Sequence, residues 1–330
     1  MNRQNANVNA NAPEKGEIPV FFSIDNSYAP FLAVALYSAV KNASPKRRYR
    51  AVILHQELSA QNAEKLKALE TPYFKIDLTP MQANFAALDD RMSNRLRCDY
   101  FTLTIYFRLF IPAMFPQYSK GIYIDSDVVI NGDLADLFAI DIGENFIGAC
   151  RDLSIADIPP LVAYTENAVG VKGNEYINSG VLLMNLKKMR DCDLEGHFLN
   201  LLNTYHFDSI APDQDYLNAI CNGNIYYLPE EWDAMPNADR PPLKNPSLIH
   251  YNLFSKPWCY SGVQYEREFW AYAEGSGYLA EIKAFKAAYS LERQQADSSC
   301  LALLVQRGTE IAQNKITFKK LHEQGVKIRL

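Results

Sequence analysis

Short apolar runs alternate with helical patterns along the first part of the chain. The runs contain few polar residues, which is typical of strands buried on both faces of a parallel sheet. This order predicts an α/β protein with a mostly parallel, Rossmann-like sheet and helices on both faces. The expected elements are a strand at 18–24, a helix at 31–40, a strand at 50–55, a helix from the N-cap Ser59 to Leu69, and a strand at 73–77.

The same pattern continues through the middle of the chain. Residues 102–114 predict a long apolar helix that contains one conspicuous cation, Arg108. A strand at 121–124 runs directly into Asp125-Ser126-Asp127. The remaining expected elements are strands at 146–150 and 180–184, helices at 197–205 and 213–221, and short strands at 225–228 and 247–250.

The two ends of the chain differ from the middle. From Tyr278 onward the pattern is helical only, and residues 278–330 hold nine Lys or Arg against five Asp or Glu, although the whole chain carries −5. Residues 1–16 are rich in Asn and Ala and lack an apolar stretch suited to a signal peptide. We therefore divide the chain into a disordered lead (1–16), a main α/β domain (17–277) and a helical C-terminal appendage (278–330).

Composition excludes some classes of partner. The chain has 330 residues, 48% of them hydrophobic, which is enough for one large domain with a substantial core. A net charge of −5 gives no global basic field, so we expect no nucleic-acid partner, and an anionic substrate must be held locally. The six cysteines have no metal-ligand or disulfide spacing, and no apolar run is long enough to span a bilayer. We therefore expect a cytoplasmic protein with free thiols.

Three Asp-x-Asp triplets are candidate metal sites, namely Asp125/Asp127, Asp191/Asp193 and Asp213/Asp215. The triplet alone is weak evidence, because acidic pairs commonly cap helices or face water. Asp191 and Asp193 follow a basic run, and we expect them to begin a helix. Asp125 and Asp127 instead end a buried strand, at the edge where open parallel sheets bind ligands. Two carboxylates there require a cation, and a divalent metal leaves positions open for phosphate oxygens.

His250 closes the last expected strand, and Lys256-Pro257-Trp258 follows six residues later. A lone His near apolar residues is more often a core residue, and a lone Lys is more often a surface residue. Together with Asp125 and Asp127, however, His250 would complete a mixed oxygen and nitrogen ligand set. Such a set suits Mn²⁺ better than Ca²⁺ or Mg²⁺, and Mg²⁺ is the alternative ion. Lys256 could then reach a diphosphate oxygen.

Six segments, in order and at sensible spacing, carry a family likeness: Asp25-Asn-Ser-Tyr28, Tyr106-Phe-Arg-Leu109, Tyr123-Ile-Asp-Ser-Asp-Val-Val129, Tyr176-Ile-Asn-Ser-Gly-Val-Leu-Leu-Met-Asn-Leu186, Asp213-Gln-Asp215 and His250-x5-Lys256-Pro-Trp258. Any one of them is modest evidence, whereas six collinear segments are strong evidence. Together they resemble the family 8 retaining glycosyltransferases, of the bacterial lipopolysaccharide galactosyl/glucosyltransferase kind and related to glycogenin. The likeness runs from about residue 18 to 260.

The resemblance implies a GT-A catalytic domain over residues 17–277. It implies transfer of glucose or galactose from a UDP-sugar to a saccharide or glycolipid acceptor, with retention, in lipopolysaccharide or other surface glycan synthesis. The implied ligands of Mn²⁺ are Asp125, Asp127 and His250. The implied contacts of the nucleotide and diphosphate are Ser23, Asp25, Ser27, Arg108, Asp125, Ser126 and Lys256. The implied contacts of the donor hexose are Asp152, Asn178, Ser179, Gly180 and Asp213, with Gln214 nearest the anomeric carbon.

Two departures from the family pattern affect this picture. Related bacterial enzymes have a glycine midway between the metal-binding histidine and the lysine, where this chain has Leu253. A glycine lets backbone approach a phosphate closely, so that contact is expected to differ here. Related enzymes also often have Ala where Ser179 stands, and a hydroxyl facing the sugar would change donor preference. The choice between UDP-glucose and UDP-galactose stays open.

The mechanism has more than one interpretation at this level. Gln214 is neutral and therefore a poor nucleophile, so we favour same-face attack, in which the departing phosphate oxygen helps to deprotonate the acceptor. Asp213 or Asp215 could instead act as nucleophile or base. In either case the metal and Lys256 would neutralise charge on the leaving diphosphate.

Other functions compete with this interpretation. A nucleotidyltransferase is disfavoured, because the first strand ends in Asp-Asn-Ser-Tyr without a basic, Gly-rich phosphate loop. An inactive UDP-sugar-binding module and glycogenin-like self-glucosylation on one of the 20 tyrosines are the alternatives. The appendage is interpreted as a helical cap packed on the catalytic domain, or as a peripheral contact with the anionic inner face of the cell membrane.

Overall fold

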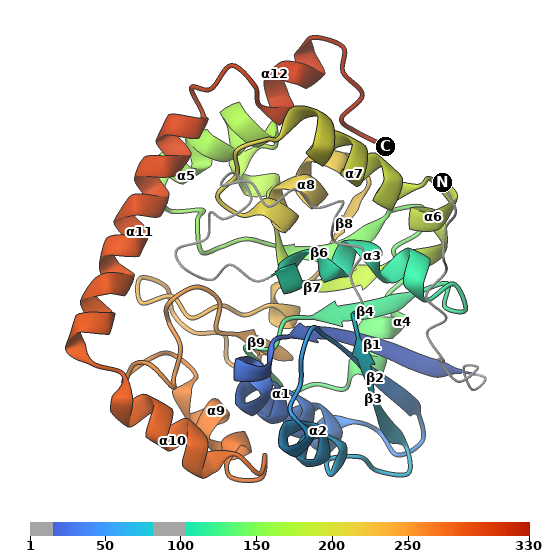
Figure 1. Cartoon of the computed structure of the whole chain (residues 1–330), viewed down its shortest axis with the longest axis vertical. Helices are drawn as coiled ribbons and strands as arrows, with labels where there is room; N and C mark the ends of the chain where they lie inside the picture. The colour runs from blue at the N-terminus through green and yellow to red at the C-terminus, as the bar shows by residue number, and fades with distance from the viewer. Residues whose placement is uncertain (1–15, 82–102) are drawn as a thin grey trace.

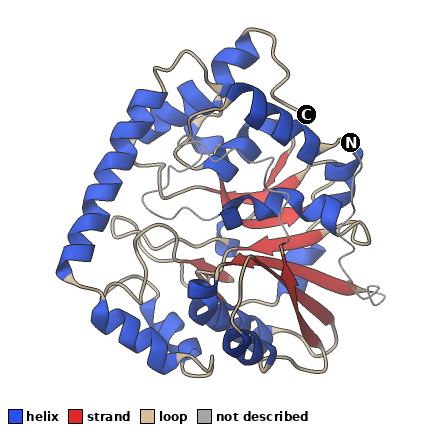
Figure 2. Cartoon of the chain, viewed as in Figure 1, coloured by secondary structure: helices blue, strands red, loops and turns tan. Residues whose placement is uncertain are grey.

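A computed structural model describes residues 16–81 and 103–330 of the chain. Its centre is a seven-stranded sheet with the strand order β3-β2-β1-β4-β7-β6-β8, and β5 and β9 form a second, two-stranded sheet. Helices lie on both sides of the strands (Figure 1 and Figure 2). The predicted α/β architecture is therefore confirmed. The predicted disordered lead and Cys98 lie outside the described residues, apart from Gly16 at the end of the lead.

The N-terminal half of the sheet is parallel, as the sequence predicts. β1 pairs with β2 from Glu17 opposite Arg48 onward, and β3 continues the sheet beyond β2. Helix α2 begins where expected, because the Ser59 side chain accepts a hydrogen bond from the Asn62 amide. The elements are β1 (Glu17–Ile24), η1 (Asn26–Tyr28), α1 (Ala29–Asn42), β2 (Arg48–His55), α2 (Ala60–Lys67) and β3 (Phe74–Pro80).

The second half of the sheet contains one reversed strand. β4 is parallel to β1, but β7 runs antiparallel to both of its neighbours, β4 and β6, and β8 is parallel to β6. The elements are η4 (Leu103–Tyr106), α3 (Phe107–Met114), β4 (Gly121–Ile124), β5 (Val128–Ile130), α4 (Leu134–Ala139), β6 (Ile147–Arg151), α5 (Pro159–Tyr164), η5 (Thr165–Val169), η6 (Gly173–Glu175), β7 (Ile177–Met184), α6 (Leu186–Asp191), α7 (Leu194–Tyr205), α8 (Pro212–Ile220), β8 (Ile225–Tyr227), η7 (Glu230–Trp232), β9 (Leu248–His250) and α9 (Glu266–Ala273).

Two local expectations need correction. The expected single helix at 102–114 is a 3₁₀ turn, η4, followed by the short helix α3, and Thr102 lies outside the described residues. Asp191 does not begin a helix but ends α6, whereas Asp193 is the N-cap of α7 and accepts a hydrogen bond from the Gly196 amide. A polar pair between two helices can serve either end, and the sequence alone did not distinguish them.

Two hydrophobic clusters cover the two faces of the sheet. Side chains of β1 alternate between them, so that Val20 and Phe22 join one cluster with α1, whereas Phe21 joins the other. Because both faces are buried, the strands read as continuous apolar runs rather than as alternating ones. This packing holds the carboxyl ends of β1 and β4 at one fixed edge.

The C-terminal helices pack onto the main domain at several points. They are α10 (Leu279–Ala288), α11 (Leu291–Ile311) and α12 (Phe318–Glu323). α10 contacts α1, α11 contacts α5, and α12 contacts η5, and Figure 1 shows α11 running along one side of the molecule. Ile282 belongs to one hydrophobic cluster, and Ile311 and Phe318 to the other. The predicted helical character is confirmed, while a domain boundary at 277 stays a prediction. Among the described helices, none combines the length and apolar character that crossing a bilayer needs.

Candidate active site

The reversal of β7 determines where the site lies. Because β7 is antiparallel to β4, its first residues stand at the same sheet edge as the carboxyl end of β4, with Ile124 paired to Val181. The Asp125 amide donates a hydrogen bond to the Gly180 carbonyl at 2.7 Å. Asn178 to Gly180 therefore lie directly beside Asp125, although more than fifty residues separate them in the sequence.

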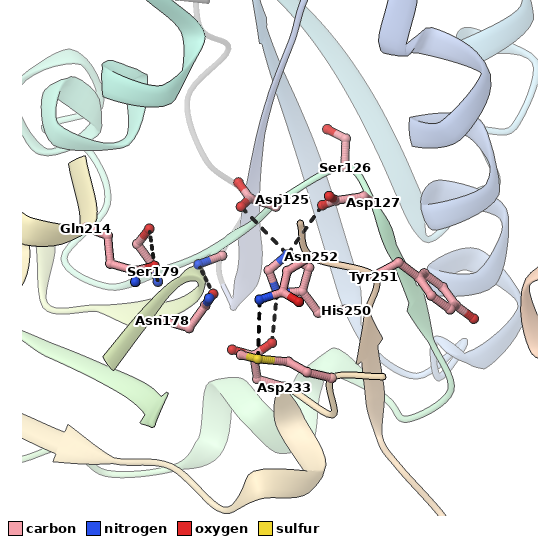
Figure 3. Close-up of polar contacts among 12 residues, drawn as sticks. Asp125, Ser126, Asp127, Asn178, Ser179, Gln214, Asp233, His250, Tyr251 and Asn252 are labelled. Atoms are coloured by element: carbon pink, nitrogen blue, oxygen red, sulfur yellow. Dashed lines mark hydrogen bonds and ion pairs between the residues drawn. The ribbon is translucent and has the colours of Figure 1, made fainter. Parts of the chain in front are cut away.

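Asp125, Asp127 and His250 form a cluster that could hold a metal ion. Ligand atoms of the three side chains all lie within 4.8 Å of one another. His250 Nε2 is 3.4 Å from Asp127 Oδ1 and 3.9 Å from Asp125 Oδ2 (Figure 3). The short sheet of β5 and β9 creates this proximity, because it pairs Val128 with His250 just after the Asp-Ser-Asp turn. Two carboxylates and one imidazole are a donor set that fits a divalent transition metal such as Mn²⁺.

Gly180 leaves the space that this cluster needs. A Cβ atom at this position would lie 2.2 Å from His250 Cε1 and 2.9 Å from Asp125 Oδ2. Both distances are shorter than van der Waals contact, so a side chain at this position would displace two of the three candidate ligands. Gly180 therefore has a steric role at this cluster, while its predicted contact with the donor hexose stays a prediction.

Each aspartate of the cluster also contacts a buried cation. Arg108 Nη2 is 2.9 Å from Asp125 Oδ1, and Arg108 Nε is 3.1 Å from Asp213 Oδ2. Lys256 Nζ forms an ion pair with Asp127 Oδ2 and donates to the Tyr251 carbonyl at 2.7 Å. Arg108 and Lys256 are both buried, which is tolerated because each cation is paired.

The charges of the cluster shift two pKa values. Burial works against ionisation of Asp127, but the positive charges of Lys256 and His250 outweigh it and lower the pKa of Asp127. Burial also lowers the pKa of His250, yet the carboxylates of Asp233 and Asp127 raise it to about 10. Without a metal, His250 therefore carries a proton at neutral pH, and a metal ion must displace that proton.

A second polar cluster begins at the N-terminus of α8. Gln214 Nε2 donates to Asp152 Oδ2 at 2.8 Å, and Gln214 Oε1 accepts from the Ser179 amide at 3.0 Å. Asn178 also donates to Asp152 Oδ2, at 3.2 Å. The Ser179 hydroxyl donates to Asp213 Oδ2 at 2.9 Å. The predicted hexose-binding residues are thus one connected network, and the hydroxyl of Ser179 is already engaged within it.

Asp215 differs from the other predicted catalytic residues. Its carboxylate is fully buried and accepts hydrogen bonds from the hydroxyls of Tyr164, Tyr176 and Ser209. Burial raises the pKa of Asp215, and these hydrogen bonds lower it only in part. Both of its oxygens face protein donors, so the geometry ties Asp215 to α5 and to the residue just before β7 and presents neither oxygen to a substrate.

The predicted nucleotide contacts lie at the carboxyl end of β1. Asp25 is the N-cap of η1, where its Oδ1 accepts from the Ser27 amide at 2.8 Å. The Ser126 hydroxyl donates to the Ser23 carbonyl at 3.2 Å. The Ser23 hydroxyl is 2.7 Å from that of Tyr123, which in turn donates to Asp125 Oδ1 at 2.9 Å. These side chains connect the end of β1 to the candidate metal cluster.

The sequence analysis missed Asp233 altogether, and it singled out Leu253 without predicting its backbone conformation. Asp233 is buried beside His250, with Oδ1 2.9 Å from Nδ1, and no motif around it pointed to the site. Leu253, which stands where related enzymes have glycine, has φ of +52°. It thus adopts the left-handed conformation that glycine enters without strain. The departure from the family pattern therefore adds a side chain while the backbone stays in a glycine-like conformation.

Comparison with known proteins agrees with this geometry. The family model described as "Glycosyl transferase family 8" matches residues 19–262. A putative glycosyltransferase of Haemophilus influenzae is 32% identical over 232 residues, which cover 70% of this chain and 67% of that protein. The lipopolysaccharide 1,2-glucosyltransferase of Escherichia coli is 29% identical over 203 residues, covering 52% of this chain and 56% of that enzyme.

Solved structures share the fold. The galactosyltransferase LgtC, crystallised with donor and acceptor sugar analogues, superposes with a TM-score of 0.66 at 24% identity, covering 78% of this chain and 96% of LgtC. The bifunctional glycosyltransferase WbbM gives a TM-score of 0.72 at 23% identity, covering 84% of this chain and 53% of WbbM. At such identities the likeness establishes the GT-A-like fold, while the activity has to be argued from the site.

Proposed function

Because the chain belongs to glycosyl transferase family 8, we propose that it transfers glucose or galactose from a UDP-sugar to a saccharide acceptor with retention of stereochemistry. We place this reaction in lipopolysaccharide or other surface glycan synthesis, in keeping with the Escherichia coli relative. The observation that carries the proposal is the convergence of Asp125, Asp127 and His250 at one sheet edge, next to the network around Gln214.

Asp125, Asp127 and His250 would hold a divalent cation, for which Mn²⁺ fits the mixed donor set best and Mg²⁺ is the alternative. When bound, the ion supplies Lewis-acid stabilisation of the diphosphate leaving group. Lys256, already beside Asp127, would add a second positive charge at that group. Ser23, Asp25, Ser27 and Ser126 would contact the uridine, because they line the end of β1 that adjoins Asp125.

The network at α8 would bind the donor hexose. Asp152 would accept hydrogen bonds from sugar hydroxyls, with Asn178 and Gln214 holding its carboxylate in place. Asp213 is paired with Arg108, so its oxygens are oriented by a fixed cation. Asp215 is enclosed by three hydroxyls and would position the first turn of α8 instead of reacting.

This arrangement favours same-face attack. Both ends of the Gln214 amide are hydrogen-bonded, and a neutral amide is a poor nucleophile, so a covalent intermediate on Gln214 is disfavoured. In the same-face route the bond from the anomeric carbon to the phosphate oxygen breaks while the bond to the acceptor oxygen forms. The acceptor proton then passes to the departing diphosphate, which leaves as UDP.

The direct test replaces one metal ligand and a matched aspartate elsewhere. Asp127→Ala is expected to abolish UDP release from UDP-glucose and UDP-galactose in the presence of Mn²⁺, while the chain still unfolds in one cooperative transition, at a lower thermal midpoint because buried Lys256 loses its carboxylate partner. Asp191→Ala is the control, because Asp191 belongs to another Asp-x-Asp triplet but is exposed and pairs only with Lys187 among the charged residues described. Undiminished turnover in Asp127→Ala would remove the metal role, and equal loss in both variants would point to instability.

Self-glucosylation is the alternative that the structure makes easiest to test. Among the described tyrosines, Tyr226 on β8 is the most exposed, at 37%, and it is the natural first acceptor to examine. Intact-mass analysis after incubation with UDP-glucose and Mn²⁺ separates the two reactions. Unchanged mass with free UDP supports transfer to another acceptor or to water, whereas hexose additions that disappear in Tyr226→Phe support self-glucosylation.

We also propose that the appendage makes a peripheral contact with an anionic membrane surface. Large apolar side chains of α11 and of the segment after it face solvent, with Leu291, Leu303 and Ile316 at 76%, 57% and 51% exposure. They accompany the local excess of Lys and Arg in residues 278–330, a combination that favours interfacial binding. Co-sedimentation with vesicles rich in phosphatidylglycerol should fall for Leu303→Glu relative to the wild type, and equal pelleting would reject the contact.

A further inference from the structure

Asp233 is held against the candidate metal ligand His250 by both side chain and backbone. Asp233 follows η7 directly, and Ala234, the next residue, forms a bridge to Ile249 of β9. The Ala234 amide donates to the Leu248 carbonyl, and the His250 amide donates to the Ala234 carbonyl, both at 2.9 Å. This backbone pairing brings Asp233 Oδ1 to 2.9 Å from His250 Nδ1 (Figure 3).

The environment of Asp233 is unusual for a carboxylate. The residue is only 1% exposed, and its Oδ2 has no hydrogen-bond partner among the described residues. A buried carboxylate with one unsatisfied oxygen costs free energy. A purely structural position would be filled at lower cost by an apolar or neutral residue. The cost of Asp233 therefore indicates a role in the site.

The contact fixes the orientation of the imidazole. A carboxylate can only accept a hydrogen bond, so Nδ1 must carry the proton that Asp233 Oδ1 receives. Nε2, the atom that faces Asp125 and Asp127, is then left as the nitrogen that can coordinate a metal. Carboxylate–histidine pairs behind metal ligands act in this way, holding the tautomer and raising the basicity of the ligand.

Each of the three candidate ligands contacts a side chain of opposite charge on the side away from the cluster. Asp125 is backed by Arg108 and Asp127 by Lys256, and both cations weaken the attraction of these aspartates for a metal ion. His250 alone is backed by an anion. Asp233 is thus the one contact behind the three ligands, within the described residues, that adds negative charge to the site.

We propose that Asp233 is a positioning residue for the metal: it fixes His250 with Nε2 toward Asp125 and Asp127 and supplies the charge that strengthens cation binding. The inference rests on the metal site of the proposed function. It concerns binding of the ion itself, so it can be measured without substrate.

The test is a titration of the full chain with Mn²⁺ alone, with free Mn²⁺ read from its electron paramagnetic resonance signal. Asp233→Asn keeps the shape and the acceptor oxygen but removes the charge, and it is expected to weaken Mn²⁺ binding about 10- to 100-fold. Asp233→Asn combined with Lys256→Met restores the charge balance and should recover part of that affinity, which a merely structural role would not predict. Glu17→Gln is the control, because Glu17 is a buried carboxylate paired with a cation, Arg50, at the opposite end of β1.

The possible outcomes distinguish failure of the role of Asp233 from failure of the proposed metal site. If the wild type binds Mn²⁺ and Asp127→Ala does not, the metal site stands, and equal binding by Asp233→Asn would then overturn the role of Asp233. If the wild type binds no better than Asp127→Ala, the metal site itself fails. Nitrogen-15 spectra of the wild type with diamagnetic Mg²⁺ give a second measure that needs no variant. With Mg²⁺ bound, a neutral ring with its proton on Nδ1 and none on Nε2 supports the proposal, and a neutral ring with its proton on Nε2 and none on Nδ1 contradicts it.

Discussion

Gln214 donates a hydrogen bond from Nε2 to Asp152 Oδ2 at 2.8 Å, while its Oε1 accepts one from the Ser179 amide at 3.0 Å. One end of this amide must be a donor and the other an acceptor. A glutamine satisfies both contacts at once, whereas a glutamate cannot. The pair therefore fixes the identity of residue 214 by hydrogen bonding alone.

Gln214→Glu should replace the donor with an oxygen facing the Asp152 carboxylate. At high pH the Glu side chain at this position and Asp152 are both ionised and repel each other. At lower pH the two carboxyl groups share one proton, which restores a hydrogen bond between them and with it part of the activity. We expect UDP release to fall roughly 100-fold at pH 8, the usual order for losing one placed donor. The ratio of variant to wild-type rate, measured from pH 5.5 to pH 8, should rise as pH falls. A ratio independent of pH would contradict the contact with Asp152.

Gly180→Ala should disrupt the candidate metal cluster sterically. The new Cβ would lie 2.2 Å from His250 Cε1, so the imidazole must move. We expect Mn²⁺ binding to be lost and stability to fall by about 1–3 kcal/mol, as for other overpacked sites. Gly148→Ala in β6 is the control, since the nearest neighbours of its Cβ would be apolar side chains at 3.0 Å or more, and none of these neighbours is a candidate ligand. Unchanged Mn²⁺ affinity in Gly180→Ala would show that His250 is not a ligand.

Leu253 should reveal its backbone strain when glycine and alanine are compared at that position. Both substitutions remove the leucine side chain, but only glycine relieves the left-handed φ of +52°. Alanine at positive φ is less stable than glycine, so Leu253→Gly is expected to exceed Leu253→Ala by about 1 kcal/mol in the free energy of unfolding. Urea denaturation measures the difference. Equal stabilities would mean that residue 253 relaxes to negative φ.

Cys221 should make the fold sensitive to alkali. Burial raises the pKa of its thiol to about 12, whereas the thiol of an unfolded chain ionises near pH 8.5. Above that pH the unfolded state loses its proton first, so this contribution to stability is complete below about pH 8.5 and declines as pH rises toward 12. Above pH 9 the free energy of unfolding, measured by urea denaturation, should fall less steeply in Cys221→Ala than in the wild type. The difference in slope should be up to about 1.4 kcal/mol per pH unit.

Cys192→Ala is the control for this experiment, because Cys192 is exposed and its thiol is in contact with water in both states. The alkaline slope of this variant should match that of the wild type. Identical slopes for Cys221→Ala and the wild type would instead show that the tyrosines, and not this thiol, dominate the alkaline response.

Local pattern was sufficient for much of this protein. Continuous apolar runs identified β1, β2 and β4, because a strand buried on both faces needs apolar residues at consecutive positions, whereas the edge strand β3 has the alternating sequence Phe-Lys-Ile-Asp. The Asp125-Ser126-Asp127 turn followed from its place directly after such a strand, and collinear motifs indicated His250 and Gln214. The strands and the turn depend on neighbouring residues alone, whereas the roles of His250 and Gln214 rested on the resemblance to family 8 glycosyltransferases.

The tertiary structure alone decided how distant segments meet. The reversal of β7 places Gly180 beside Asp125, and the pairing of the segment after η7 with β9 places Asp233 behind His250. Nothing local distinguishes Asp233 from an exposed acid, or Asp215 from a reactive one, because burial and hydrogen-bond partners arise only when remote elements pack. Sequence therefore determined which groups could do the chemistry, and packing determined which of them face the site, since contact depends on three-dimensional proximity that no local pattern encodes.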